Sequence, residues 1–198
     1  MREMISMVVV LTVLSAVAGG LLAVVKTGTS ERIENQVLKF QKAPAIKLIL
    51  SDVDNDPLQD RFKLNDQEQE ITFFTGKKDN KPVSVAFEGK GKGYGGDIGV
   101  MVAVNLESDE IAGVSVTTHS ETPGVGSRAK DNPDFVSQFA GLSLNDATFA
   151  VKDSGGDINA MSGATITSKG VCFAVKQAQD IYQRLKPEIQ NQIKQLAN

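Results

Sequence analysis

An uncharged run near the N-terminus constrains this chain more than any other feature of its sequence. The run extends from Met4 to Val25, 22 residues between Glu3 and Lys26. At 1.5 Å per residue, a helix of that length spans about 33 Å, enough to cross a hydrocarbon core of about 30 Å. The sequence therefore predicts an N-terminal transmembrane helix, and with it a membrane as one partner of the chain.

A cleaved signal peptide is the alternative interpretation of the same run. Ala16 and Ala18, followed by Gly19, resemble the small residues of a cleavage site. Apolar residues continue beyond that site to Val25, where a mature N-terminus would usually turn polar. The pattern therefore favours a retained helix, with residues 1–28 as the anchor.

The charges around the helix bear on which side of the membrane the following domain lies. Arg2 is the basic residue before the helix, whereas four basic residues follow within about 20 positions: Lys26, Arg32, Lys39 and Lys42. Counted alone, they place the following domain in the cytoplasm. The rule weakens for a long following domain, which translocates largely regardless of charge.

Composition excludes several classes of function. The 198 residues are 41% hydrophobic and carry a net charge of -3 with no basic run, so a nucleic-acid partner is not expected. Cys172 is the only cysteine and His119 the only histidine, which argues against a metal site within the chain. The length allows one folded domain of about 150 residues beside the anchor.

The pattern of the remaining chain predicts an α+β fold, an antiparallel sheet with flanking helices. We expect a helical linker region over 29–70, in which Ser30 caps a helix over 29–50 and Pro44 bends it. The main domain, 71–186, contains strands expected at 71–75, 83–88, 98–105, 111–118 and 148–151, and helices expected at 132–139 and 168–185. Pro187 is expected to end the last helix, leaving 187–198 as a polar C-terminal tail.

A run of small and hydroxyl residues leads into the last expected helix. It begins at Asp157 and contains Ser162-Gly163-Ala164-Thr165-Ile166-Thr167-Ser168. Helix N-termini present free backbone N–H groups and the positive end of the helix dipole, which suit a phosphate. The same residues also suit an ordinary cap turn, with Thr167 or Ser168 as the cap, so the run alone leaves both interpretations open.

Two glycine-containing loops add to this pattern. His119-Ser120-Glu121-Thr122-Pro123-Gly124-Val125-Gly126 follows the strand at 111–118, and its backbone would allow close approach of a flat ring. Gly91-Lys92-Gly93-Tyr94-Gly95-Gly96 precedes the strand at 98–105, where Tyr94 either lines a pocket or packs on the sheet. Seen alone, the loop 119–126 is more typical of an ordinary Pro-Gly turn, and the glycine-rich turn 91–96 leaves both roles of Tyr94 open.

These three segments, in the order in which they follow one another along the chain (91–96, 119–126 and 157–168), resemble the FMN-binding domain of the G subunit of Rnf complexes and the C subunit of sodium-pumping NADH:quinone oxidoreductases. The resemblance implies FMN held covalently through a phosphoester to Thr165, installed by a separate flavin transferase for which Asp157 is required. It also implies that further cofactor-binding residues come from the same segments: Ser162, Gly163, Ala164, Thr167, Glu121, Thr122, Gly124 and Tyr94.

The function implied by the resemblance is electron transfer within a membrane complex. The chain would be one carrier subunit of an ion-translocating Rnf-type ferredoxin:NAD oxidoreductase, with other membrane and peripheral subunits as partners. A single helix would anchor it in the inner membrane, with the soluble domain on the non-cytoplasmic side. The short chain favours this subunit over its sodium-pumping homologue, and an anchored binding module without flavin is the third alternative.

Overall fold

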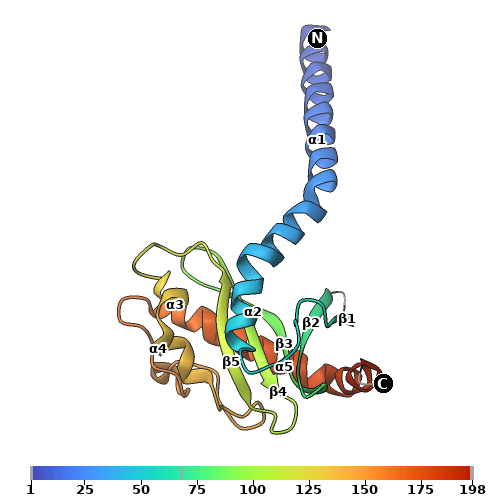
Figure 1. Ribbon diagram of the computed structural model, residues 1–198. Coiled ribbons are helices and arrows are strands. Elements are labelled where there is room, and N and C mark those ends of the chain that lie inside the picture. The colour runs from blue at the N-terminus through green and yellow to red at the C-terminus, as the bar shows by residue number, and fades with distance from the viewer. Residues whose placement is uncertain (1, 68, 197–198) are drawn as a thin grey trace. The chain divides into compact units, whose positions relative to one another are not determined.

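The computed structural model describes residues 2–67 and 69–196 (Figure 1). The chain forms two compact units, one ending at Phe40 and the other beginning at Gln41. The first unit is helical, and the second contains the sheet and all the motifs discussed above.

Helix α1 (Arg2–Val37) contains the whole uncharged run. Every side chain from Arg2 to Gly28 is exposed within this unit, and the segment Arg2–Ser30 is long and apolar enough to cross a membrane. The hydroxyls of Thr12 and Thr27 donate to the carbonyls four residues earlier, at 2.8 and 2.9 Å, so these polar groups are satisfied without water. The length and composition are those of a membrane-spanning helix.

Ser30 does not begin a new helix, contrary to expectation. Ser30 lies in the interior of α1, where its hydroxyl donates to the Thr27 carbonyl at 2.9 Å. The helix continues through this position because the chain has no proline before Pro44. A π-helical turn, η1 (Leu38–Lys42), then leads into α2 (Ala43–Ile49), whose first turn contains Pro44. The interruption expected at Pro44 is therefore confirmed, and proline's missing N–H explains it.

Five strands form one antiparallel sheet in the order of the sequence. They are β1 (Arg61–Asp66), β2 (Gln69–Lys78), β3 (Lys81–Lys92), β4 (Asp97–Asn105) and β5 (Ile111–Thr118). Asp79 and Asn80 join β2 to β3 with φ angles of 51° and 61°, the left-handed conformation that two-residue hairpin turns favour. The expected strands of the sheet and the α+β class are thus confirmed.

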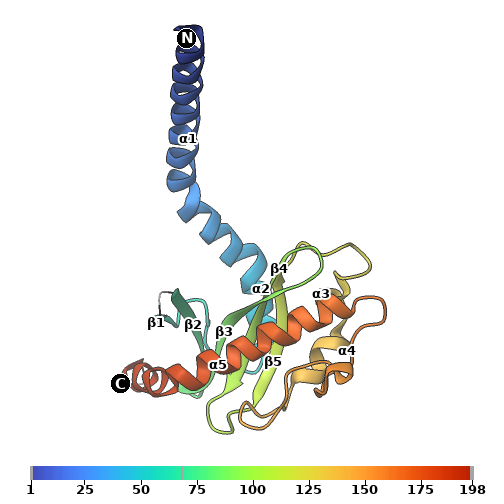
Figure 2. The ribbon, with the colours of Figure 1, turned by 180° about the vertical axis from the view of Figure 1, so that it is seen from behind.

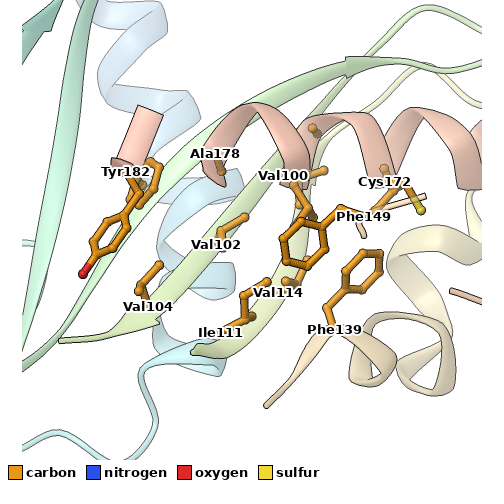
Figure 3. Close-up of a cluster of buried hydrophobic side chains, with 14 of the residues drawn as sticks. Val100, Val102, Val104, Ile111, Val114, Phe139, Phe149, Cys172, Ala178 and Tyr182 are labelled. Atoms are coloured by element: carbon orange, nitrogen blue, oxygen red, sulfur yellow. The ribbon is translucent and has the colours of Figure 1, made fainter. Parts of the chain in front are cut away.

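The inner strand β4, which lies between β3 and β5, is buried on both faces. Val100, Val102 and Val104 belong to the core cluster shared with helix α5 (Thr165–Leu196), which crosses one face of the sheet (Figures 2 and 3). Alternate residues of β4 point to the opposite face, where α2 packs and buries Ile46. Complete burial of both faces explains why β4 is an unbroken apolar run.

Helix α5 is longer at both ends than the sequence predicted. It begins at Thr165 instead of Ser168, because the Ser168 N–H already donates to the Ala164 carbonyl at 2.9 Å. It also continues through Pro187, so the expected break and polar tail are wrong. Ile189 is fully buried in the core cluster, and this burial offsets the backbone hydrogen bond that the proline removes.

Strand β1 was not expected within the segment 29–70. It is an edge strand in which Leu64 is buried and Phe62 half-buried, too few apolar positions for a clear alternation. Arg184 of α5 forms a salt bridge with Asp66 at the end of β1, with the guanidinium and carboxylate 2.5 Å apart. The edge strand and the C-terminal half of α5 thus support each other.

Short elements fill the chain between β5 and α5. They are α3 (Arg128–Asp131), α4 (Pro133–Val136), the 3-10 helices η2 (Ser137–Phe139) and η3 (Lys152–Ser154), and a parallel bridge between Val151 and Ile158. The expected helix at 132–139 is confirmed as α4 and η2, with Asn132 accepting the Asp134 N–H at 2.9 Å. The strand expected at 148–151 is reduced to that bridge, since its neighbours curve into η3.

Candidate functional site

The residues Met161 to Ala164 form a tight turn directly before α5. The Ala164 N–H donates to the Met161 carbonyl at 3.0 Å, and Gly163 has a φ of 76°. A positive φ at the third position of a β-turn defines type II and favours glycine. A Cβ on Gly163 would meet open space, so this glycine is required by backbone conformation and not by crowding.

Ser168 holds this turn from within the helix. Its buried hydroxyl accepts the Met161 N–H at 3.0 Å and donates to the Ala164 carbonyl at 2.9 Å. The sequence suggested Ser168 as a helix cap, but the helix has already begun and the side chain pins the loop instead. The turn is consequently fixed relative to the first residues of α5.

Thr165 occupies the first position of α5 and is exposed. Among the described residues, no acceptor receives the backbone N–H groups of Thr165, Ile166 or Thr167. These N–H groups and the positive end of the dipole of a 32-residue helix lie at the helix end that carries Thr165. An anionic group bonded to or near this hydroxyl would meet favourable charge and free donors.

Glu121 connects the three motif segments through its carboxylate. Only 6% exposed, it accepts the Gly95 N–H on Oε1 at 2.8 Å and the Thr167 hydroxyl on Oε2. The sequence offered Glu121 as a contact to a flavin ring, but both of its oxygens face protein donors. Thr167 likewise turns its hydroxyl inward, where it is 2% exposed, and not toward the surface of the turn.

The loop after β5 is folded around one carbonyl. The Thr122 oxygen accepts the N–H groups of Val125, Gly126 and Ser127 at 3.1 to 3.2 Å. Gly124 has a φ of 72°, and its N–H donates to the Ser127 hydroxyl at 2.9 Å. Thr122, Gly124 and Val125 are exposed, so this loop presents backbone and a valine side chain to a ligand.

Tyr94 lies in the turn between β3 and β4 with 75% of its surface exposed. This excludes packing on the sheet, one of the two roles considered for it. The neighbouring Gly95 is joined to Glu121, so the Tyr94 turn belongs to the same cluster as the loop 119–126. Tyr94, Val125 and Ile166 provide exposed apolar side chains from the three segments that Glu121 and Thr167 connect.

Arg128 is a site residue that the sequence interpretation missed. Its Nε donates to the Val125 carbonyl at 3.1 Å and its Nη2 to the Ser162 carbonyl, so it joins the loop to the Ser-Gly-Ala-Thr turn. No carboxylate of the described residues forms an ion pair with it. A basic residue two positions after the glycine loop was the available signal, but only the tertiary fold brings it to Ser162.

Asp157 lies apart from the carboxylate cluster of Glu121. Its Oδ2 accepts the Thr148 N–H at 2.8 Å and its own N–H donates to the Thr148 carbonyl at 3.2 Å. These bonds close the loop from Thr148 to Asp157, which contains η3. The side chain remains exposed, so a part in recognition by a flavin transferase stays a prediction.

Cys172 and a surface groove are two other features of the domain, and neither has the properties of a second functional site. Burial raises the pKa of the Cys172 thiol to about 12, which keeps it protonated and unreactive near neutral pH. An open groove of about 440 Å³ lies between residues 147–154 and α5, lined in part by Lys169, Phe173 and Lys176, but no predicted site residue borders it. No group of metal-binding side chains occurs in the part of the chain that the structure describes.

The fold and the Ser-Gly-Ala-Thr turn define a known class of domain. The model of the family described as FMN-binding domain matches residues 93–180, which include the segments 119–126 and 157–168 and most of the glycine-rich turn 91–96. A solved structure of NqrC from Shewanella oneidensis aligns with a TM-score of 0.52 and 28% identity, over 71% of this chain and 75% of that one.

Curated relatives resolve the family further. The G subunit of the ion-translocating oxidoreductase complex of Erwinia tasmaniensis is 34% identical over 179 residues, 85% of each chain. The protein of the same name from Escherichia coli O157:H7 is 31% identical over 194 residues, 93% of each chain. The chain belongs to this family, the G subunits of ion-translocating oxidoreductase complexes.

Proposed function

We propose that this chain is a membrane-anchored electron-transfer subunit that carries FMN through a phosphoester to Thr165. The observation that carries the proposal is the position of the Thr165 hydroxyl: exposed, first in α5, and beside three backbone N–H groups without acceptors among the described residues. Bound FMN would supply the redox chemistry, since its ring accepts and releases electrons. The protein would supply attachment, orientation and charge.

The residues around Thr165 fit a phosphoester. The N–H groups of the first helical turn would donate to phosphate oxygens, and the helix dipole favours the negative charge. Arg128 uses two of its five N–H donors on carbonyls and keeps its positive charge next to the turn. The exposed Ser162, Gly163 and buried Ala164 leave no bulky side chain on the approach to the hydroxyl.

The loops would hold the flat ring of the flavin. Val125 and Tyr94 offer apolar surface, and the exposed residues Thr122 and Gly124 beside Val125 leave room for a flat ring to approach the loop. Covalent attachment keeps a cofactor on a domain whose site is open to solvent. In this arrangement the hydroxyl acts in retention, whereas the loops act on the ring.

The relatives' name supports the assembly in which the chain would act. The G subunit in those organisms belongs to a complex that couples oxidoreduction to ion translocation. We infer that this chain docks with other subunits of such an Rnf-type complex and receives its flavin from a transferase. The soluble domain would lie on the non-cytoplasmic side, as the resemblance to Rnf G subunits implies. The basic residues that follow α1 are weak evidence against this orientation, because a long domain is translocated largely regardless of charge.

Substitution of the attachment residue tests the proposal directly. Thr165→Val removes the hydroxyl while preserving volume at an exposed helix position, so the full chain should fold and lose all covalent flavin. Thr165→Ser keeps a hydroxyl and should retain flavin, and Ser162→Ala removes the nearby exposed hydroxyl and should leave labelling intact. In-gel flavin fluorescence after denaturation, on chains expressed in the native host, measures all three.

The pattern of the three variants distinguishes the alternatives. Flavin that persists on the Thr165→Val chain would place the attachment elsewhere. A wild-type chain without covalent flavin in its native host would instead leave an anchored FMN-binding-domain protein that acts without a covalent cofactor.

A further inference from the structure

We propose that Glu121 is a positioning residue: its carboxylate is a latch that fixes the two glycine-containing loops against the first turn of α5. The inference rests on the proposed function, because the element it positions carries Thr165. It assigns Glu121 a role that differs from direct contact with a flavin ring. The latch consists of Glu121, Thr167 and the Gly95 N–H.

The hydrogen bonds of the latch connect three distant parts of the sequence. Oε1 accepts from Gly95 in the turn after β3, and Oε2 accepts from the Thr167 hydroxyl in the first turn of α5. Glu121 itself lies in the loop after β5. One side chain therefore fixes the separation between both loops and the helix start.

Two glycines of the motifs make room for this carboxylate. A Cβ on Gly93 would overlap Glu121 Oε1, and a Cβ on Gly126 would lie 2.5 Å from Oε2. Both approaches are too close for any real contact, so neither position admits a side chain while the carboxylate stays in place. Gly124 differs, since a Cβ there meets nothing and only its positive φ favours glycine.

The charge of the latch is compensated without a cation. No lysine or arginine in the described ranges forms an ion pair with Glu121, and a buried carboxylate is costly unless donors satisfy it. The donors here are the Thr167 hydroxyl and the Gly95 N–H, and the positive end of the α5 dipole adds a favourable electrostatic contribution. The Oε2 atom accepts from the Thr167 hydroxyl and not from a backbone N–H of the first helical turn. The N–H groups of that turn are therefore not used by the latch, and a phosphate could accept from them.

Loss of the latch should loosen the loops without removing the attachment hydroxyl. Thr167 lies two residues after Thr165, so its bond to Glu121 sets where the helix start sits relative to the loop 119–126. Displacement of a reacting group by about 1 Å can reduce a rate about 100-fold. Flavin transfer to Thr165 should therefore slow when the latch is broken.

The first test uses the flavin-free full chain in detergent and requires no cofactor. Thr167→Val removes the hydroxyl and should speed amide hydrogen exchange in residues 93–97 and 119–127, whereas Thr167→Ser should keep wild-type exchange. Glu121→Gln should act in the same direction as Thr167→Val. Wild-type exchange in both loops of Thr167→Val would overturn the latch.

A matched control separates the latch from general destabilisation. Thr117 is also buried and donates its hydroxyl to a carboxylate, that of Glu88, at 2.5 Å. Thr117→Val breaks an equivalent bond outside the latch and should alter exchange in β5 and β3 but not in residues 93–97 or 119–127. Equal loosening of those loops by Thr117→Val would contradict a specific role for Glu121.

The second test measures flavin transfer in vitro with a transferase, FAD and magnesium. Thr167→Val should lower kcat/KM for the acceptor chain about tenfold or more, and Thr167→Ser should restore it to near wild type. Unchanged transfer to Thr167→Val would show that the latch does not position the acceptor. Failure of the wild-type chain to accept flavin would defeat the proposed function, while the exchange experiment would still decide whether the latch exists.

Discussion

Three hydroxyl side chains in one short run lie in three different environments. Thr165 is exposed, Thr167 donates to a buried carboxylate, and Ser168 holds the preceding turn. Of these three, only Thr165 combines an exposed side chain with a place in the first turn of α5, where backbone N–H groups have no acceptor among the described residues. This difference in environment, more than residue type, is why we propose Thr165 as the attachment residue.

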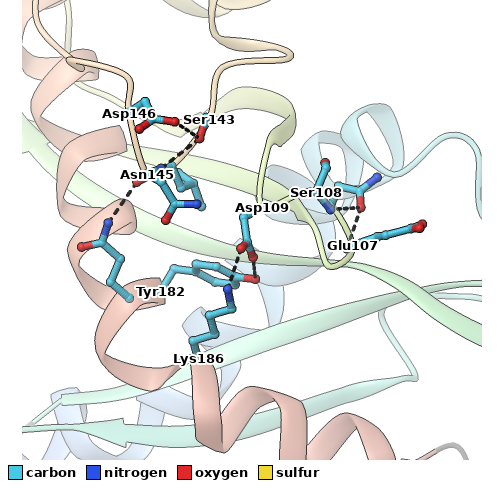
Figure 4. Close-up of polar contacts among 11 residues, drawn as sticks. Glu107, Ser108, Asp109, Ser143, Asn145, Asp146, Tyr182 and Lys186 are labelled. Carbon is cyan, nitrogen blue, oxygen red and sulfur yellow. Dashed lines mark hydrogen bonds and ion pairs between the residues drawn. The ribbon is translucent and has the colours of Figure 1, made fainter.

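Asp109 is a second residue whose environment has a measurable consequence. Burial raises the pKa of its carboxyl, but hydrogen bonds from Lys186 and Tyr182 and the Lys186 charge outweigh this, so the pKa lies below its usual value (Figure 4). The carboxylate accepts from Tyr182 at 2.8 Å and from Lys186 at 2.5 Å. Burial and the neighbouring Asp109 raise the pKa of Tyr182, which stays a donor.

The lowered pKa of Asp109 predicts a loss of stability in acid. Because the unfolded chain binds a proton at higher pH than the folded chain, the free energy of unfolding falls as pH drops below about 4. Asp109→Asn, which tolerates the φ of 56° at this position, should flatten this dependence. Asp60 and Asp66, whose pKa values are also lowered, should preserve part of it.

Urea unfolding of the full chain in detergent, repeated from pH 5 to pH 3, measures the slope. The exposed Glu107→Gln serves as the control and should behave as wild type. An unchanged slope in Asp109→Asn would contradict a net favourable interaction of this carboxylate in the folded state.

Some site residues were predictable from the sequence because their roles are local. Gly163 and Gly124 adopt positive φ angles within turns, and Thr165 precedes an amphipathic helix, which composition and spacing reveal. Glu121 and Arg128 were not predictable in the same way, since their partners lie 26 to 46 and 34 residues away. The sequence marked Glu121 as important but not the direction in which its carboxylate points.

At the scale of elements, the inner strands of the sheet and the existence of α5 followed from periodicity. Val171, Val175 and Tyr182 recur at helical spacing and are buried, and β5 has the expected bounds. Strand β1 and the end of α5 were missed together because each depends on the other. An edge strand with two inward apolar residues gives little signal, and Pro187 suggested a helix end that tertiary packing overrides.

The extended α5 predicts a large effect at Ile189. Ile189→Ala should destabilise the folded domain by about 2 to 5 kcal/mol, because it leaves a cavity where the side chain is fully buried. Gln190→Ala, at the exposed neighbouring position, should change stability by less than about 0.5 kcal/mol. Chemical denaturation of the full-length variants measures both, and equal stabilities would mean that the segment after Pro187 does not pack on the sheet.

At the scale of the whole molecule, the chain combines a helix suited to a membrane with a domain suited to a covalent cofactor. The exposed apolar surface of α1 would be unfavourable in water, and the helix satisfies its own backbone and the hydroxyls of Thr12 and Thr27. The anchor would confine the domain to one membrane surface, where a carrier subunit meets its electron donor and acceptor. The proposal therefore requires a defined side of the membrane.

Protease treatment of intact spheroplasts tests that side. With the domain outside the cytoplasm, a C-terminal epitope tag should be cleaved before the cells are lysed, while a cytoplasmic marker survives. Protection of the tag until lysis would support the topology indicated by the basic residues after α1 and would contradict the proposed orientation.

The central claim concerns one bond, between FMN and Thr165. The most direct measurement is mass spectrometry of the intact chain purified from its native host, followed by peptide mapping across residues 157–169. The proposed function predicts a gain equal to one FMN less one water, located on Thr165 and absent from the Thr165→Val chain. An unmodified native chain, or a flavin mapped to another residue, would contradict it.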